Sequence, residues 1–138
     1  IDEVRKDFEP TIWIPDNEKK VDLKQVWFAG VHSDVGGSYK PDVNGRTLAE
    51  IPMLWMKKEA ELQQLKFKKY LDVETDPLSP KHNEQKSFYK LLGEHVREIL
   101  PHTPIHKSVK IRYEKDPSYR PKNLVEYIEK YGWTNIEE

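Results

Sequence analysis

The sequence predicts part of an α/β domain, in which a strand buried on both faces is followed by amphipathic helices. Residues 26–31 read Val-Trp-Phe-Ala-Gly-Val, a continuous apolar run that is typical of a doubly covered strand. After a loop rich in glycine, proline and asparagine, an apolar stripe recurs at helical spacing, with the members Ile51, Leu54, Trp55, Leu62 and Leu65. We therefore expect a strand over residues 25–31 and a helix over about residues 50–66.

The boundaries of the helices follow from capping and proline signals. Thr47 and Glu50 have the spacing of a capping box, whereas Pro52 indicates that the first turn lies about two or three residues later. A second amphipathic helix is expected from about residue 83 to residue 100. A last short helix is expected from Asn123, with Gly132 at its end.

The remaining segments have weaker patterns. The chain opens with apolar residues on one helical face, and Pro10 ends that pattern. Residues 11–14 form a short β-prone piece. Residues 109–113 alternate between apolar and charged side chains, which indicates a short strand or an extended arm. The Asp-Pro and Arg-Pro steps after them favour extended coil over residues 116–121.

Composition excludes several classes of protein. The net charge of −1 gives none of the basic field that dominates nucleic-acid binding. There is no cysteine, so disulfides and cysteine-based zinc sites are excluded, and no histidine pair has metal-ligand spacing with a carboxylate. We therefore expect neither a metal nor a cofactor. No apolar run reaches the length of a membrane-spanning helix, and no signal peptide is visible.

The chain opens at Ile1 rather than at a methionine, so we expect an upstream portion and leave the compartment open. Apolar residues make up 36% of the chain, below the roughly 45–50% of globular proteins, as expected for part of a domain. A doubly covered strand whose sheet neighbours lie elsewhere leaves side chains and backbone groups unpaired. The sequence therefore predicts a large exposed apolar surface beside residues 25–31.

The loop after the buried run carries the best functional candidate, His32. Strand ends in α/β sheets are where such proteins build their sites, and an imidazole exchanges protons near neutral pH. Asp34 could hold the loop by accepting amide hydrogen bonds, while Gly36 and Gly37 would allow a tight turn or a close approach to substrate. A histidine beside a glycine turn is more often structural, so these residues alone leave both roles open.

Residues 26–39, Val-Trp-Phe-Ala-Gly-Val-His-Ser-Asp-Val-Gly-Gly-Ser-Tyr, closely resemble the hallmark segment of an α/β-hydrolase family. That family includes the class 1 type VI secretion lipase effectors and many uncharacterised bacterial and fungal proteins. Three further segments agree with it in type and order, namely the Asp-Glu-x-Arg stretch with Phe8, Pro10 and Trp13, residues 48–60, and residues 105–121. The resemblance implies that the chain is the C-terminal portion of an α/β-hydrolase-like fold, with its last core strand and the helices that follow.

The resemblance also implies a serine esterase or lipase, with His32 as general base of a Ser-Asp-His triad. No serine in the chain has the Gly-x-Ser-x-Gly context of a nucleophile elbow. Both serine and acid are therefore expected upstream, and the isolated 138 residues are expected to be inactive. Asp2 is a candidate acid for which a supporting role is favoured, and Asp34 more plausibly organises the loop. A phospholipid or other ester would be the substrate, and the upstream portion of the domain the partner.

Two other interpretations stay open at this point. The chain could be a binding or scaffold module that has lost its catalytic half, with Gly36 and Gly37 serving a turn. A phosphate-binding loop is less favoured, because neither a Walker lysine nor a Gly-x-Gly-x-x-Gly pattern is present. His106 lies in the closing segment, where packing and hydrogen bonding are its favoured roles.

Overall fold

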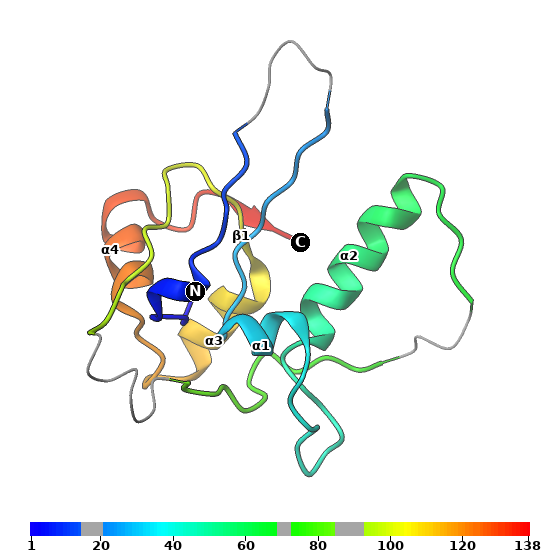
Figure 1. Ribbon diagram of the computed structural model, residues 1–138, viewed down its shortest axis with the longest axis horizontal. Coiled ribbons are helices and arrows are strands. Elements are labelled where there is room, and N and C mark those ends of the chain that lie inside the picture. The colour runs from blue at the N-terminus through cyan, green and yellow to red at the C-terminus, as the bar shows by residue number, and fades with distance from the viewer. Residues whose placement is uncertain (15–20, 69–72, 85–92) are drawn as a thin grey trace.

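A short parallel ladder lies among helices and long connecting segments in the computed structural model, which describes residues 1–14, 21–68, 73–84 and 93–138 (Figure 1). The elements, in chain order, are the 3-10 helix η1 (Lys6–Phe8), α1 (His32–Gly36), α2 (Glu50–Leu62), β1 (Ile105–His106), α3 (Lys107–Lys115), α4 (Lys122–Tyr131) and β2 (Ile136–Glu137). Helices together with a two-stranded parallel sheet are compatible with part of an α/β domain. The hydrolase-type fold itself stays a prediction.

The predicted strand over residues 25–31 is an extended segment of which Trp27 alone forms a β-bridge. Strand β1 pairs in parallel with β2, with Ile105 opposite Ile136, and Trp27 joins its other side by a parallel bridge. The Trp27 amide donates to the Pro104 carbonyl at 2.9 Å, and the His106 amide donates to the Trp27 carbonyl at 3.0 Å.

The opposite edge of this extended segment is paired with the start of the chain. The Ile1 nitrogen donates to the Phe28 carbonyl at 2.9 Å, and the Asp2 amide donates to the Gly30 carbonyl at 3.2 Å. The expectation that its neighbours lie outside the chain is therefore wrong for these backbone groups. The pairing also places residues 1–5 beside the segment that leads to His32.

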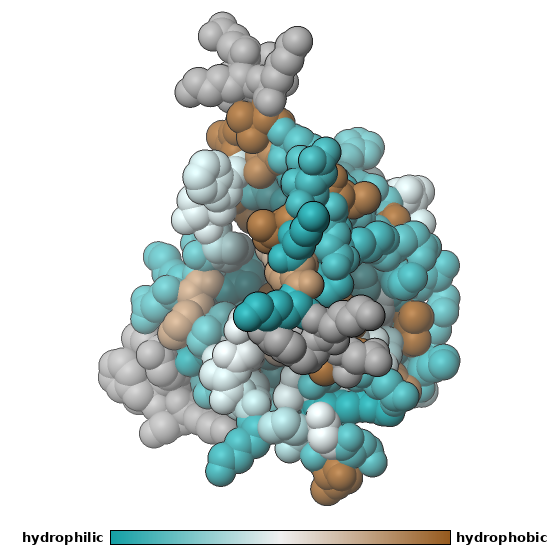
Figure 2. Space-filling view, turned by 90° about the vertical axis from the view of Figure 1, so that its right-hand side faces the viewer, coloured by the Kyte–Doolittle hydropathy of each residue, from teal (hydrophilic) through white to brown (hydrophobic). Residues whose placement is uncertain are grey.

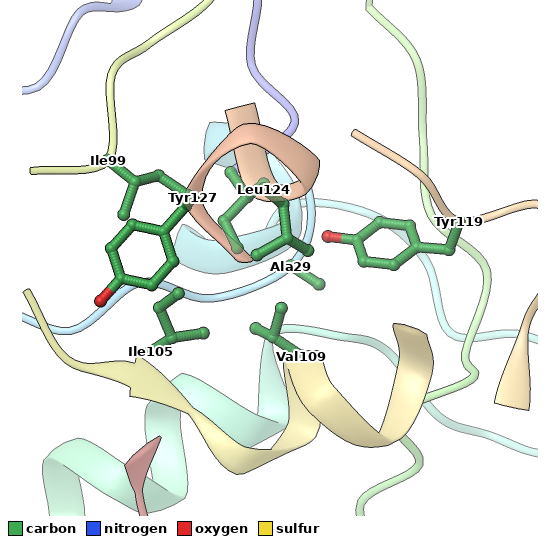
Figure 3. Packing of buried hydrophobic residues seen from close by; sticks show 8 residues of the cluster. Ala29, Ile99, Ile105, Val109, Tyr119, Leu124 and Tyr127 are labelled. Atoms are coloured by element: carbon green, nitrogen blue, oxygen red, sulfur yellow. The ribbon is translucent and has the colours of Figure 1, made fainter. Parts of the chain in front are cut away.

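Both faces of the extended segment are covered, as the apolar run predicts. Ala29 packs into one cluster with residues of β1, α3 and α4 (Figure 3). The buried members of this cluster are Ile1, Ala29, Ile99, Ile105, Val109, Tyr119, Leu124 and Tyr127. Phe28, the adjacent residue, packs into a second cluster with Leu48, Ile51 and Trp55 around α2. Successive side chains of an extended chain point to opposite faces, so neighbouring residues enter different clusters.

The expected exposed apolar surface lies beside this segment. Residues 10–14 and 21–25 form an arm that projects from the rest of the molecule (Figure 1). Four of its apolar side chains, those of Ile12, Trp13, Ile14 and Val21, are exposed, Trp13 by 69%. The same region carries a cluster of hydrophobic surface at the upper end of the molecule in Figure 2. The residues on the arm itself show no strand pairing within the described part of the chain, although 11–14 were predicted to be β-prone.

Two predicted helices are confirmed, with corrected ends. Helix α2 begins at Glu50 and ends at Leu62, about four residues before the predicted end. Its N-cap is Ala49, which makes no side-chain cap bond, so the predicted capping box does not form. Pro52 fits because amides of the first turn lack helical partners anyway. Helix α4 ends at Tyr131, and Gly132 caps it as predicted, with φ +66°.

Other predictions from periodicity are wrong. Residues 1–5 are not helical, and only η1 forms near Pro10, because the segment pairs with the extended segment instead. Residues 83–84 and 93–100 are also not helical; the rest of that predicted helix, residues 85–92, lies outside the described residues.

The predicted strand at residues 109–113 is helix α3. Val109 and Arg112 are buried on one face, three residues apart, which is the helical repeat. The preceding His106 caps the helix, because its imidazole accepts a hydrogen bond from the Ser108 amide at 3.2 Å. An alternation over five residues is too short to distinguish the two periods.

Leu124 tests the larger core cluster. It is 0% exposed, so Leu124→Ala removes buried surface and leaves a cavity that α4 cannot easily close. We expect the free energy of unfolding to fall by about 2–5 kcal/mol in urea denaturation. The matched control Leu62→Ala, at a side chain that is 64% exposed, should change it by less than about 0.5 kcal/mol. Equal losses in both variants would contradict this packing.

His106 predicts a pH dependence of stability. Burial, assisted by the charge of Lys107, lowers the pKa of His106 to about 4 from 6.5. As pH falls from about 6.5 to about 4, the unfolded chain binds this proton and the folded one does not, so stability is lost across that window. Urea melts should show a loss of about 1–3 kcal/mol that His106→Gln removes. Parallel pH curves for both proteins would contradict the assignment.

Candidate active site

His32 lies where the extended segment turns into helix α1. Gly30, with φ +105°, makes the turn, and His32 is the first residue of the five-residue helix, not a loop residue as predicted. Gly36 is the last residue of α1, and Gly37 caps it with φ +79°. The ring thus follows the end of the buried segment directly.

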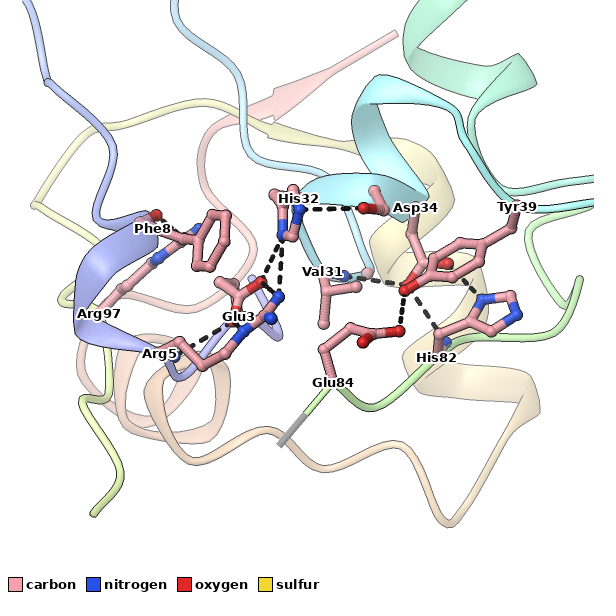
Figure 4. Close-up of polar contacts among 12 residues, drawn as sticks. Glu3, Arg5, Phe8, Val31, His32, Asp34, Tyr39, His82, Glu84 and Arg97 are labelled. Carbon is pink, nitrogen blue, oxygen red and sulfur yellow. Dashed lines mark hydrogen bonds and ion pairs between the residues drawn. The ribbon is translucent and has the colours of Figure 1, made fainter. Parts of the chain in front are cut away.

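The ring of His32 has a partner at each nitrogen and one against its face. Its Nδ1 lies 2.7 Å from Oε2 of Glu3, and its Nε2 lies 3.0 Å from the hydroxyl of Ser33. Phe8 stacks on the ring with centroids 4.2 Å apart (Figure 4). The His32 side chain is still 40% exposed, so part of the ring remains accessible from outside.

Glu3 is a buried carboxylate, with its side chain 1% exposed. The Arg5 guanidinium binds it through two bonds, from Nε to Oε1 at 2.9 Å and from a terminal nitrogen to Oε2 at 2.8 Å. Burial alone would raise the pKa of Glu3, but hydrogen bonds from Arg5 and His32 outweigh it and lower that pKa to about 2. The Arg5 guanidinium also lies over the Phe8 ring, 4.2 Å from its centroid.

Asp34 faces away from the His32 ring and binds backbone. Its carboxylate accepts from the Val31 amide at 3.0 Å, which half-completes a capping box for α1, and from the His82 amide at 3.2 Å. The His82 imidazole lies 2.7 Å from the other oxygen and stacks on Tyr39. Burial, followed by a hydrogen bond to Glu84, raises the pKa of Tyr39 to about 12.

Asp2 supports the backbone just before His32. Its carboxylate accepts from the Gly30 amide at 2.6 Å and from the Tyr119 hydroxyl at 3.0 Å, and it pairs with Lys81 at 3.3 Å. Burial, together with the Asp2 charge, raises the pKa of Tyr119. The structure therefore places Asp2 and Asp34 on opposite sides of the Gly30 turn, each bonded to its backbone.

An apolar groove of about 830 Å³ runs beside the ring. His32 lines it together with residues of the arm and the extended segment, among them Ile12, Trp13, Val26 and Trp27, and with Leu100 from the connection before β1. The arrangement therefore combines a proton-accepting ring with a surface that suits a hydrocarbon chain. Among the described residues, no three histidine, aspartate or glutamate side chains gather as a metal site would require.

Sequence reasoning missed the residues that hold the ring. Glu3, Arg5 and Phe8 lie on a segment predicted to be helical, and their approach to His32 depends on pairing between residues 1–2 and 28–30. His82 lies among polar neighbours in the sequence, which give no signal for its contact with Asp34. The Asp-Glu-x-Arg pattern was the signal available for Glu3. His106 is buried and caps α3, in line with the structural role favoured for it.

Comparison with known proteins gave a match for the first part of the chain, which contains His32. Residues 1–59 match the family model of the catalytic domain of Tle1-like phospholipase effectors of the type VI secretion system. This match confirms the family resemblance, and the family is one of enzymes. Searches of curated proteins and of solved structures gave no match. None of the described helices is long and apolar enough to cross a membrane.

The Gly30 turn can be tested by adding a single methyl group. A Cβ at Gly30 would lie 2.4 Å from the Asp34 Cβ, and its φ is unfavourable for any other residue. We expect Gly30→Ala to lower the free energy of unfolding by about 1–3 kcal/mol. Gly36→Ala is the matched control, because nothing lies within 4 Å of its Cβ position. Thermal melts in which both variants lose the same stability would contradict this geometry.

Proposed function

We propose that the protein hydrolyses lipid esters, with His32 as the general base and acid of a serine hydrolase. The single observation that carries the proposal is the placement of His32. Its ring is held at Nδ1 and against its face, and the partly exposed side chain lines an apolar groove. The residues of this arrangement, from Glu3 to Ser33, lie inside the range matched by a phospholipase catalytic domain.

The proposed reaction proceeds through an acyl-enzyme on a serine outside these 138 residues. Nε2 of His32 takes the hydroxyl proton as the serine oxygen bonds to the ester carbonyl carbon. The same nitrogen returns the proton to the alkoxide as the ester C–O bond breaks and the alcohol leaves. Water then repeats the sequence on the acyl-enzyme and releases the fatty acid.

Ser33 supports the proton-accepting role without being the nucleophile. Its hydroxyl lies 3.0 Å from Nε2, the distance at which a serine would donate to a general base. Ser33 belongs to the same short helix as His32 and lacks the strand-to-helix elbow that exposes a nucleophile. We infer that the hydroxyl occupies the position that the nucleophile takes in the active enzyme.

The apolar groove is the proposed site for the acyl chain of the substrate. It is lined by His32 and by the arm, on which the exposed Ile12 and Trp13 provide hydrocarbon and aromatic surface. Burial of a chain there would contribute about 0.8 kcal/mol for each methylene group. This size of contribution favours a long-chain ester over a short one.

Replacement of His32 tests the proposal. In the intact protein, His32→Ala should cut hydrolysis of p-nitrophenyl esters and phospholipid vesicles by about a thousandfold or more, because triad members act together. Its melting temperature should change little, since the ring is partly exposed. His95→Ala, at another partly exposed imidazole that binds a glutamate, is the matched control and should keep full activity. Full activity in His32→Ala would leave a binding or scaffold role instead.

A further inference from the structure

We propose that Glu3 is the positioning residue for His32, and that its carboxylate keeps the imidazole proton on Nδ1 so that Nε2 is free to accept. This inference rests on the proposed function and assigns the acidic partner of the proposed base. It goes beyond the sequence, from which the acid of a Ser-Asp-His triad is expected upstream and Asp2 is favoured for a supporting role.

The distances around Nδ1 decide which nitrogen carries the proton. Nδ1 lies 2.7 Å from Oε2 of Glu3 and 3.1 Å from a terminal nitrogen of Arg5. If Nδ1 were unprotonated, two lone pairs would face each other at the shorter distance, which is repulsive. A proton on Nδ1 turns that contact into a charge-assisted hydrogen bond of ordinary length. The Arg5 nitrogen is near because it binds the same oxygen.

The proton on Nδ1 leaves Nε2 with a lone pair in the neutral ring. The Ser33 hydroxyl lies 3.0 Å from Nε2 and can donate to it, which is compatible with this tautomer. A general base requires it, because the accepting nitrogen must face the nucleophile. The stacked Phe8 ring, inclined by 13°, fixes the plane in which both bonds lie.

Arg5 makes Glu3 suitable for this role. Two bonds from the guanidinium and one from the Arg5 backbone amide, at 3.1 Å, fix both carboxylate oxygens. The low pKa of Glu3, about 2, keeps the carboxylate ionised at any pH near neutrality. Because the Arg5 charge balances that of Glu3, Glu3 acts mainly by fixing the orientation and the tautomer of the His32 ring.

The two aspartates nearest to His32 in the sequence are bonded elsewhere. Asp2 binds Gly30, Tyr119 and Lys81, and Asp34 binds Val31 and His82. Among the described residues, Glu3 supplies the carboxylate that contacts the His32 ring. Its position before His32 also fits the chain order of α/β-hydrolases, in which the acid precedes the histidine.

The test is the tautomer of His32, read from long-range proton–nitrogen NMR spectra of the intact, ¹⁵N-histidine-labelled protein at a pH where the ring is neutral. We expect the proton on Nδ1 in the wild type. Glu3→Gln should move it to Nε2, because the amide can donate to Nδ1, and kcat for ester hydrolysis should fall by at least about a hundredfold with KM little changed. Glu9→Gln, at the exposed partner of His95, is the matched control and should alter neither.

A wild-type ring with its proton on Nε2 would overturn the assignment, as would a folded Glu3→Gln protein that keeps both the Nδ1 proton and the wild-type kcat. Should Glu3→Gln fail to fold, the wild-type spectrum still decides. The spectrum needs no activity, so the Glu3 assignment can hold or fail separately from the ester hydrolysis tested by His32→Ala.

Discussion

A carboxylate without access to water must be bonded on all sides, and Glu3 meets this requirement with Arg5 and His32. Removing Arg5 would leave a buried charge uncompensated, which typically costs about 3–5 kcal/mol. The two partners come from separate parts of the chain, since His32 is 29 residues from Glu3. The bonding of one buried group therefore fixes the start of the chain against helix α1 and determines the direction of the imidazole.

The extended segment before His32 connects the site to the core and to strand β1. Phe28 and Ala29 enter different core clusters, Trp27 pairs with β1, and the Gly30 amide is held by Asp2. Asp34 fixes the other side of the turn through the Val31 amide. The site is therefore partly exposed at the ring and rigid beneath it, which is what preorganised proton transfer needs.

The sequence predicts the parts of this arrangement that depend on local pattern. The apolar run locates the doubly covered segment, Gly132 locates the end of α4, and the position of His32 after the run follows directly. Helix α3 is missed because five alternating residues fit both periods. Glu3 is missed for another reason: its contact with His32 depends on pairing between distant segments, for which single-sequence periodicity holds no signal. Asp2, for which a supporting role is favoured, is adjacent to Glu3 and accepts from the Gly30 amide.

The most direct measurement of the account is a double-mutant cycle in kcat/KM for ester hydrolysis, with Glu3→Gln, His32→Ala and the combined variant of the intact protein. If Glu3 acts only through His32, its replacement has nothing left to remove once the ring is gone. We expect the combined variant to have the same residual rate as His32→Ala. A combined loss equal to the product of the two single losses would contradict it.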